Sequence, residues 1–235
     1  NDAKDNAILI PTWYSGTHQI WADAYVGEGH ALDPSRYFIV CVNQIGNGLS
    51  TSPHNTVDGA LRVREIADFT VIIGEEVGTA DGEVTGLFLT ETIPRGLSAV
   101  ETVKRIKEQG GLVSVPHPFD RFRSGVITQA GLEAVLPYTD VVEVFNSRNN
   151  LDADNRKAYD FATAHGLLTS GVSDAHTPME LGRTYVEIPD FDGSPDGFRS
   201  SLAQGTIHAR KTSPLIHVLT TLTKIKKRAL FHHSR

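Results

Sequence analysis

The sequence holds an aspartate and a histidine two residues apart, Asp174 and His176, directly after the apolar run at residues 166–170. In an extended segment, residues i and i+2 point to the same side, so this carboxylate and imidazole can reach one ion from the end of a strand. These two groups suit Zn²⁺, Mn²⁺ or Fe. The alternative interpretation is a helix cap or a solvated pair, as Asp-x-His often is in loops. Only the surrounding residues can decide between the two.

Strands that alternate with helices must position this pair. Strands are predicted at residues 6–12, 37–43, 69–73, 84–89, 112–115, 141–145, 166–170, 183–188 and 206–209. Helices are predicted at residues 57–67, between the Ser98 cap and Gly110, at 152–165, and from Ser213 onward. This alternation predicts an α/β fold with a mainly parallel sheet or barrel.

Polar residues follow several of the predicted strands. In parallel α/β folds, ligands gather at the C-terminal ends of strands, so these positions are the candidates for chemistry. They are Glu76, His117, Asn146, Arg148, Asp174 and His176. Singly, each has a structural alternative, such as a turn-stiffening histidine or a helix-capping acid. Together they predict a metal site at one edge of the sheet.

Several arginines lie in or near the same loops. A guanidinium can contact a phosphate through two N–H groups, which would complete a site for phosphate esters. The candidates are Arg95, Arg121, Arg123 and Arg148. Solvation at the surface is the alternative for each of them.

Five segments carry a family resemblance: 74–77 (GEEV), 82–89 (GEVTGLFL), 109–121 (QGGLVSVPHPFDR), 142–146 (VEVFN) and 173–176 (SDAH). This set resembles the PHP (polymerase and histidinol phosphatase) superfamily of metal-dependent phosphoesterases, from about residue 54 to the C-terminus. The resemblance implies a distorted (β/α)₇ barrel with a di- or trinuclear site that hydrolyses phosphomonoesters or phosphodiesters. Its substrate would be a phosphorylated small molecule or a nucleotide.

The resemblance also implies roles for individual residues. Glu76, His117, Asp174 and His176 would be metal ligands, and His54 would be a further ligand. Asp174 and His176 are also predicted to be catalytic, and so is Arg148, on its position among the loops rather than on the resemblance.

The chain departs from the family pattern at two places. The family segment around His54 reads Thr-Asp-His-Asn, whereas Pro53 precedes His54 here, and the family's opening His-x-His strand is absent. We therefore expect divalent ions (Zn, Mn or Fe) in fewer than the full trinuclear set.

The first 53 residues resemble a different family. Residues 6–17, 27–37 and 43–53 are similar to the early part of homoserine O-acetyltransferase-like α/β-hydrolases. No Gly-x-Ser-x-Gly motif occurs in the chain, so a Ser-His-Asp acyl-transfer site cannot be assembled. We therefore interpret Ser15, His18, His30 and Asp33 as structural or solvated, with substitution of His18 or His30 for a missing metal ligand as the alternative.

These two resemblances predict the domain organisation. Residues 1–53 would be an α/β-hydrolase-like βαβ segment that replaces the first βαβ unit of the barrel. Residues 54–235 would be a PHP-like domain that is incomplete at its N-terminus. The sequence is thus interpreted as a chimera joined near residue 53.

Composition narrows the function classes. The net charge of −6 argues against a broad nucleic-acid-binding surface. No apolar run is long enough to span a membrane and no signal peptide is evident, so a cytoplasmic protein is expected. The basic run at residues 224–228 is interpreted as favouring a helix C-terminus, with a phosphate or nucleic-acid contact as the alternative. The sequence does not determine the oligomeric state.

The function predicted from the sequence is metal-dependent phosphoester hydrolysis with an incomplete metal site and weak activity. A non-catalytic metal- or phosphate-binding module is the main alternative. An acyl-transfer enzyme of the α/β-hydrolase type is a third possibility, which the missing motif disfavours.

Overall fold

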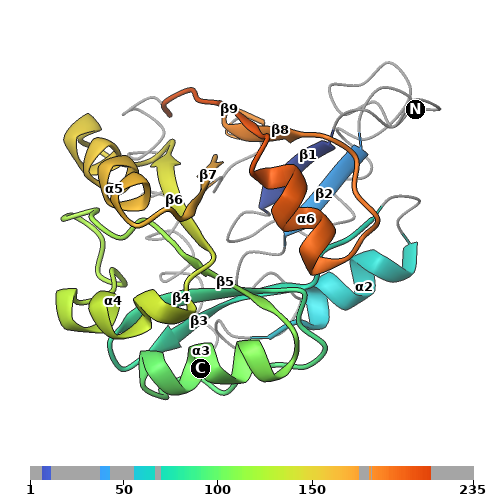
Figure 1. Cartoon of the computed structure of the whole chain (residues 1–235), viewed down its shortest axis with the longest axis horizontal. Coiled ribbons are helices and arrows are strands. Elements are labelled where there is room, and N and C mark those ends of the chain that lie inside the picture. Colours follow the sequence, from blue (N-terminus) through green and yellow to red (C-terminus); the bar gives the residue numbers. More distant parts are fainter. Residues whose placement is uncertain are drawn as a thin grey trace, which may run out of the picture.

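The computed structural model describes residues 7–11, 38–42, 56–66, 70–174, 180 and 182–212, and it contains two sheets (Figure 1). One has the order β2-β1-β8-β9 and is made of β1 (Ala7–Pro11), β2 (Phe38–Val42), β8 (Tyr185–Ile188) and β9 (Thr206–His208). The other has the order β3-β4-β5-β6-β7 and is made of β3 (Gly74–Thr79), β4 (Gly82–Leu87), β5 (Leu112–Val115), β6 (Val141–Asn146) and β7 (Leu168–Val172).

Helices connect and cover these strands. They are α2 (Asp58–Ile66), α3 (Ala99–Glu108), α4 (Gln129–Val135), the 3₁₀ helix η1 (Leu136–Tyr138), α5 (Asp152–Ala164) and α6 (Pro195–Leu202). Figure 1 shows α3 along the β3–β5 part of the sheet, α5 beside β6, and α6 near β8. The core under α3 contains Val77 of β3, Val84 of β4, and Val113 and Val115 of β5.

The closed (β/α)₇ barrel expected from the sequence is not observed among the described residues, where both sheets are open. The five-stranded sheet is mixed: β3 pairs antiparallel with β4, and β4 pairs antiparallel with β5. The cause is local, because Ala80 and Asp81 alone join β3 to β4, and so short a connection permits only an antiparallel hairpin. Gly82 (φ 122°) follows in a conformation that disfavours other residues.

The second half of this sheet follows the expected pattern. Strands β5, β6 and β7 are parallel neighbours, linked by α4 with η1 and by α5. Their C-terminal ends therefore meet at one edge of the sheet. Residues that immediately follow these strands, including His117 and Asp174, are brought close by this topology.

The helix predicted after Ser98 is confirmed together with its cap. The Ser98 hydroxyl accepts a hydrogen bond from the Glu101 N–H at 3.2 Å. Val103 and Ile106 are buried beneath the helix, and the chain leaves it through Gly110 at φ 75°. This helix covers one face of the sheet and leaves the other face for the site.

Several other helices and strands differ from the prediction, were not predicted, or lie outside the described residues. The prediction of a strand at residues 69–73 is wrong, because regular strand pairing begins only at β3. One hydrogen bond precedes it, from the Leu89 N–H to the Ile73 carbonyl at 2.9 Å. Helices α4 and α6 were not predicted, although Ser194 before Pro195 carries the same cap-then-proline signal as Ser213. The helix expected from Ser213 onward lies outside the described residues.

The two N-terminal strands pair in parallel, as the predicted βαβ outline requires. In addition, β1 pairs antiparallel with β8, so both ends of the described chain share one sheet. The boundary at residues 53 and 54 lies outside the described residues and stays a prediction.

Candidate metal centre

Two glutamates of the β3–β4 hairpin and the histidine after β5 converge on one point. In the hairpin register Glu76 lies opposite Thr85, and Gly78 lies opposite Glu83. Opposite residues and residues two apart share a face, so Glu76 and Glu83 are diagonal neighbours on the same side of the sheet. His117 reaches the same side from the end of β5, two residues beyond Val115.

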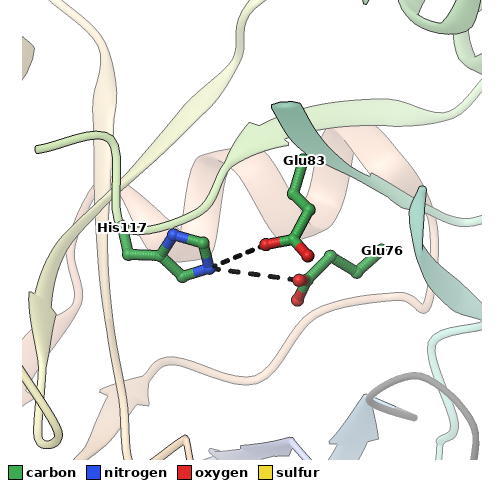
Figure 2. Close-up of side chains that lie close together, drawn as sticks. All are labelled: Glu76, Glu83 and His117. Atoms are coloured by element: carbon green, nitrogen blue, oxygen red, sulfur yellow. Dashed lines mark ion pairs between the residues drawn. The ribbon is translucent and has the colours of Figure 1, made fainter. Parts of the chain in front are cut away.

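The distances fit a site for one cation. His117 Nε2 lies 3.5 Å from Glu83 Oε2 and 3.9 Å from Glu76 Oε1. One ligand atom from each of the three residues lies within 4.8 Å of the others, and Figure 2 shows both carboxylates turned toward the imidazole. Imidazole together with carboxylate is a donor set for Zn²⁺, Mn²⁺ or Fe.

The state of His117 supports this interpretation. The residue is 2% exposed, and neither ring nitrogen has a hydrogen-bond partner within the described part of the chain. Burial, and after it the Arg123 guanidinium, lowers the pKa of His117 to about 3. The ring is therefore neutral at pH 7, and its Nε2 faces two carboxylates. A bound cation would satisfy both the nitrogen and the oxygens, so the residues fit a metal.

The charges of Glu76 and Glu83 also favour a bound cation. Burial, followed by the charge of Glu83, raises the pKa of Glu76 well above its ordinary value. Two acids held together without a cation repel each other, which costs free energy. A divalent ion between them would remove this repulsion.

A second layer of side chains lies beyond His117 and comes from within β6 and from the end of β7. Glu143 Oε1 accepts hydrogen bonds from His117 N–H at 3.2 Å and from Asn146 Nδ2 at 2.8 Å. Asn146 Nδ2 also donates to Asp174 Oδ2 at 3.2 Å. Burial raises the pKa of Glu143 to about 8, although its hydrogen bond from Asn146 acts in the opposite direction.

An irregularity in β6 makes this second layer possible. Glu143 and Asn146 are three residues apart, so a regular strand would place them on opposite faces. The pairing register with β7 shifts between Glu143 and Phe145, as in a β-bulge. The extra residue turns Asn146 to the side of Glu143.

The backbone is strained at two predicted ligands. His117 has φ 31° and Asp174 has φ 47°, and both lie in the left-handed region that disfavours residues other than glycine. Such conformations concentrate at functional sites, where the surrounding structure holds them. Here each one occurs where a parallel strand ends and its side chain turns toward the site.

Arg123 brings a positive charge to the Asp174 side. Its Nη2 donates to Asp174 Oδ2, and its Nε lies 3.5 Å from Asp120 Oδ2. Burial alone would lower the pKa of Arg123, but Asp174, Glu143 and Glu76 raise it. Asp174 is therefore paired with a cationic side chain, unlike Glu76.

The structure thus brings Glu76, His117 and Asp174 to one side of the sheet. His54 and His176, the other predicted ligands, lie outside the described residues, and their role stays a prediction. Arg148 Nη1 donates to Glu180 Oε1 at 2.6 Å, and both residues are buried. Its predicted contact with phosphate is not tested.

Sequence reasoning missed Glu83 and Glu143 as members of the site. Glu83 had a readable signal, because the Asp81-Gly82 turn sets the hairpin register that places it beside Glu76. Glu143 had none, because it lies within a strand rather than after it and depends on the bulge. Arg95, one of the candidate arginines, is exposed.

Glu76 lies within β3 and not after a strand as predicted, whereas His117 and Asp174 follow β5 and β7. A mixed α/β fold with these side chains on one side of the sheet defines the class of protein, and the comparisons with known proteins agree. The family model described as PHP-associated matches residues 152–207. MJ0417 of Methanocaldococcus jannaschii is 36% identical over 174 residues, which are 70% of this chain and 70% of that protein. The chain belongs to the PHP superfamily, which confirms the resemblance stated above.

A solved structure and a second relative extend this result. A two-domain protein from Bacteroides vulgatus, which contains a predicted PHP-like metal-dependent phosphoesterase, superposes with a TM-score of 0.62 at 17% identity, over 89% of this chain and 66% of that chain. The homoserine O-acetyltransferase of Nautilia profundicola is 33% identical over 84 residues, which are 31% of this chain and 23% of that protein, and this confirms the resemblance to homoserine O-acetyltransferases. The probable esterase Cgl0839 of Corynebacterium glutamicum is 57% identical over 81 residues. Those residues are 34% of this chain, which spans only 23% of the esterase.

No helix among the described residues combines the length and the apolar character that crossing a membrane requires.

Proposed function

We propose that this chain hydrolyses phosphomonoesters or phosphodiesters with the help of a divalent cation. The observation that carries the proposal is the buried imidazole of His117, whose ring nitrogens have no hydrogen-bond partner among the described residues and which faces Glu83 and Glu76. Membership of the PHP superfamily and the likeness of its fold to a PHP-like phosphoesterase support it. The proposed substrate is a phosphorylated small molecule or a nucleotide.

The position of each residue indicates the role that we propose for it. Glu76, Glu83 and His117 would hold a first ion, and Asp174 would serve the same ion or a second one together with His176 and His54. The bound ion (Zn, Mn or Fe) would supply a more acidic water and neutralise charge on the phosphate. Glu143 and Asn146 would hold the His117 backbone and Asp174 in place through the hydrogen bonds described above. Because no His-x-His pair occurs in the sequence, we propose fewer ions than a trinuclear site holds.

A second candidate, a non-catalytic metal- or phosphate-binding module, has one observation in its favour. Asp174, a predicted catalytic residue, is already paired with Arg123. A site that keeps this pair permanently would bind one ion at the glutamates without assembling the full catalytic set. The acyl-transfer alternative has no such support, because the chain has no nucleophile elbow.

Metal analysis and turnover separate these candidates. The purified chain would be loaded with Zn²⁺, Mn²⁺ or Fe²⁺ and assayed with bis(p-nitrophenyl) phosphate and with p-nitrophenyl acetate, beside His117→Gln and Asp174→Asn. We expect bound metal and phosphodiester turnover in the wild type, loss of metal in His117→Gln, and loss of turnover in Asp174→Asn. Metal binding without turnover would favour the non-catalytic module. Full activity in Asp174→Asn would exclude the proposed site.

A further inference from the structure

Arg123 occupies an unusual position for a basic residue beside acidic metal ligands. It lies on the loop after β5, and its side chain is 24% exposed. The preceding residue, Phe122, is 66% exposed, so the loop is at the surface. The guanidinium points inward and donates to Asp174, and it also approaches Asp120.

The other arginines near the site are placed differently. Arg121, two residues away on the same loop, donates to Asp154 Oδ1 at 2.7 Å with a side chain that is 60% exposed. Arg148 donates to Glu180 and is buried. Arg123 thus pairs with a predicted metal ligand and also lies partly in solvent.

Charge explains why the Arg123–Asp174 pair forms. The carboxylates of Asp174, Glu143 and Glu76 all interact favourably with the guanidinium and raise the pKa of Arg123. Arginine does not lose its proton in proteins, so it cannot make way for a cation by becoming neutral. The contact is to Oδ2 of Asp174, so a metal ion that binds this oxygen must displace the side chain.

We infer that Arg123 and a divalent cation compete for Asp174, and that the displaced guanidinium then binds the phosphate of the substrate. This inference deepens the proposed function and rests on it. After the cation has taken Asp174, the nearby Asp120 carboxylate can keep the Arg123 side chain at the site. The planar guanidinium offers two parallel N–H donors, which match two oxygens of a phosphate. Phosphate binding would thus depend on prior metal binding.

Metal affinity tests the first half of the inference independently of activity. Mn²⁺ and Zn²⁺ affinities would be measured by calorimetry for the wild type, Arg123→Gln and Arg121→Gln. Arg121→Gln is the matched control, because it removes the same charge from the same loop without touching Asp174. We expect Arg123→Gln to bind metal about tenfold more tightly and Arg121→Gln to match the wild type. Equal affinities in all three proteins, or a similar gain in both variants, would overturn the competition.

Inorganic phosphate tests the second half. We expect the wild type to bind phosphate at least tenfold more tightly with Mn²⁺ than without it, and Arg123→Gln to lose most of this gain. A gain that survives in Arg123→Gln would overturn the role in phosphate binding.

Two further measurements keep the outcomes distinct. If the wild type binds no metal, the proposed function fails first; if it binds metal and turns over substrate while Arg123→Gln behaves like the wild type, only this inference fails. Thermal unfolding would confirm that each variant is folded. If Arg123→Gln is unfolded, Arg123→Lys replaces it: we expect weaker phosphate binding than the wild type, because an ammonium cannot make the bidentate contact, and wild-type phosphate binding would contradict the inference.

Discussion

Consecutive residues of β3 place one carboxyl group on each face of the five-stranded sheet. Glu76 faces His117 and Glu83 in the candidate site. Glu75 lies on the opposite face, is 1% exposed, and accepts a hydrogen bond from the Ile93 N–H at 3.0 Å. Its second oxygen has no partner among the described residues.

The comparison of Glu75 with Glu76 shows that burial alone does not make a carboxyl group a metal ligand. Burial raises the pKa of both carboxyls, to about 7 for Glu75 and well above its ordinary value for Glu76. On the Glu75 side the neighbours are core residues such as Ile93, and burial outweighs the hydrogen bond from the Ile93 N–H, so the acid lowers its free energy mainly by holding a proton. On the Glu76 side a second carboxylate and a neutral imidazole offer a cation three ligands.

Stability measurements should separate these two roles most strongly. The folded state holds the proton of Glu75 up to a pKa of about 7, whereas the unfolded state releases it near 4.5. Wild-type stability should therefore fall as the pH rises from about 4.5 to about 7. We expect Glu75→Gln to gain on the order of 3 kcal/mol in free energy of unfolding at pH 8 and nothing at pH 4. Denaturant unfolding at both pH values checks this, and a variant equally stable to the wild type at pH 8 would contradict the assigned cost.

Metal affinity should depend strongly on Glu76 and hardly at all on Glu75. We expect Glu76→Gln to lose about 100-fold in Mn²⁺ affinity, roughly 2.7 kcal/mol, because a charged ligand is lost. Glu75→Gln should stay within about twofold of the wild type, because its amide lies on the other face. Calorimetric titration of both variants makes the comparison, and similar losses in both would show that the site is not confined to one face.

A glycine contact tests the contribution of Glu83. A Cβ atom at Gly125 would lie 2.2 Å from Glu83 Oε2 and 2.4 Å from Oε1, so Gly125→Ala must push this carboxylate away. We expect about a tenfold loss of metal affinity, roughly 1.4 kcal/mol. The stability of the metal-free protein should change little, because the end of a flexible side chain can move. Unchanged affinity would remove Glu83 from the site. Gly96→Ala serves as a control with no atom near its Cβ, although its φ of 81° adds local strain.

The smallest effect concerns protons released on metal binding. Because the pKa of Glu76 is raised, the metal must displace a proton from this face when the carboxyl is protonated, and affinity should increase as the pH rises above the ordinary range of a carboxyl group. The pKa of His117, about 3, means that the imidazole contributes no proton in this range. Titrations in buffers with different ionisation enthalpies count the protons. Zero proton release would show that Glu76 is already ionised before the metal binds.

Much of the site could be approached from local sequence signals. Glu76 and His117 follow apolar runs, and the parallel order of β5, β6 and β7 brings the residues after these strands to one edge, as predicted. The mixed sheet was not predicted, because strand alternation suggested parallel pairing and the two-residue link between β3 and β4 received too little weight. The bulge that turns Asn146 toward Glu143 leaves no mark that a periodic pattern can detect.

The sequence by itself determined which residue types stand at the strand ends, where helix α3 begins at Ser98, and which superfamily the chain belongs to. These properties depend on short-range spacing, which a linear pattern records. Only the tertiary structure decided that Glu83 joins Glu76 and that Arg123 pairs with Asp174, 51 residues further along the chain. Such contacts depend on strand order and loop path, and the electrostatic balance of the site exists only once the sheet has brought the charges together.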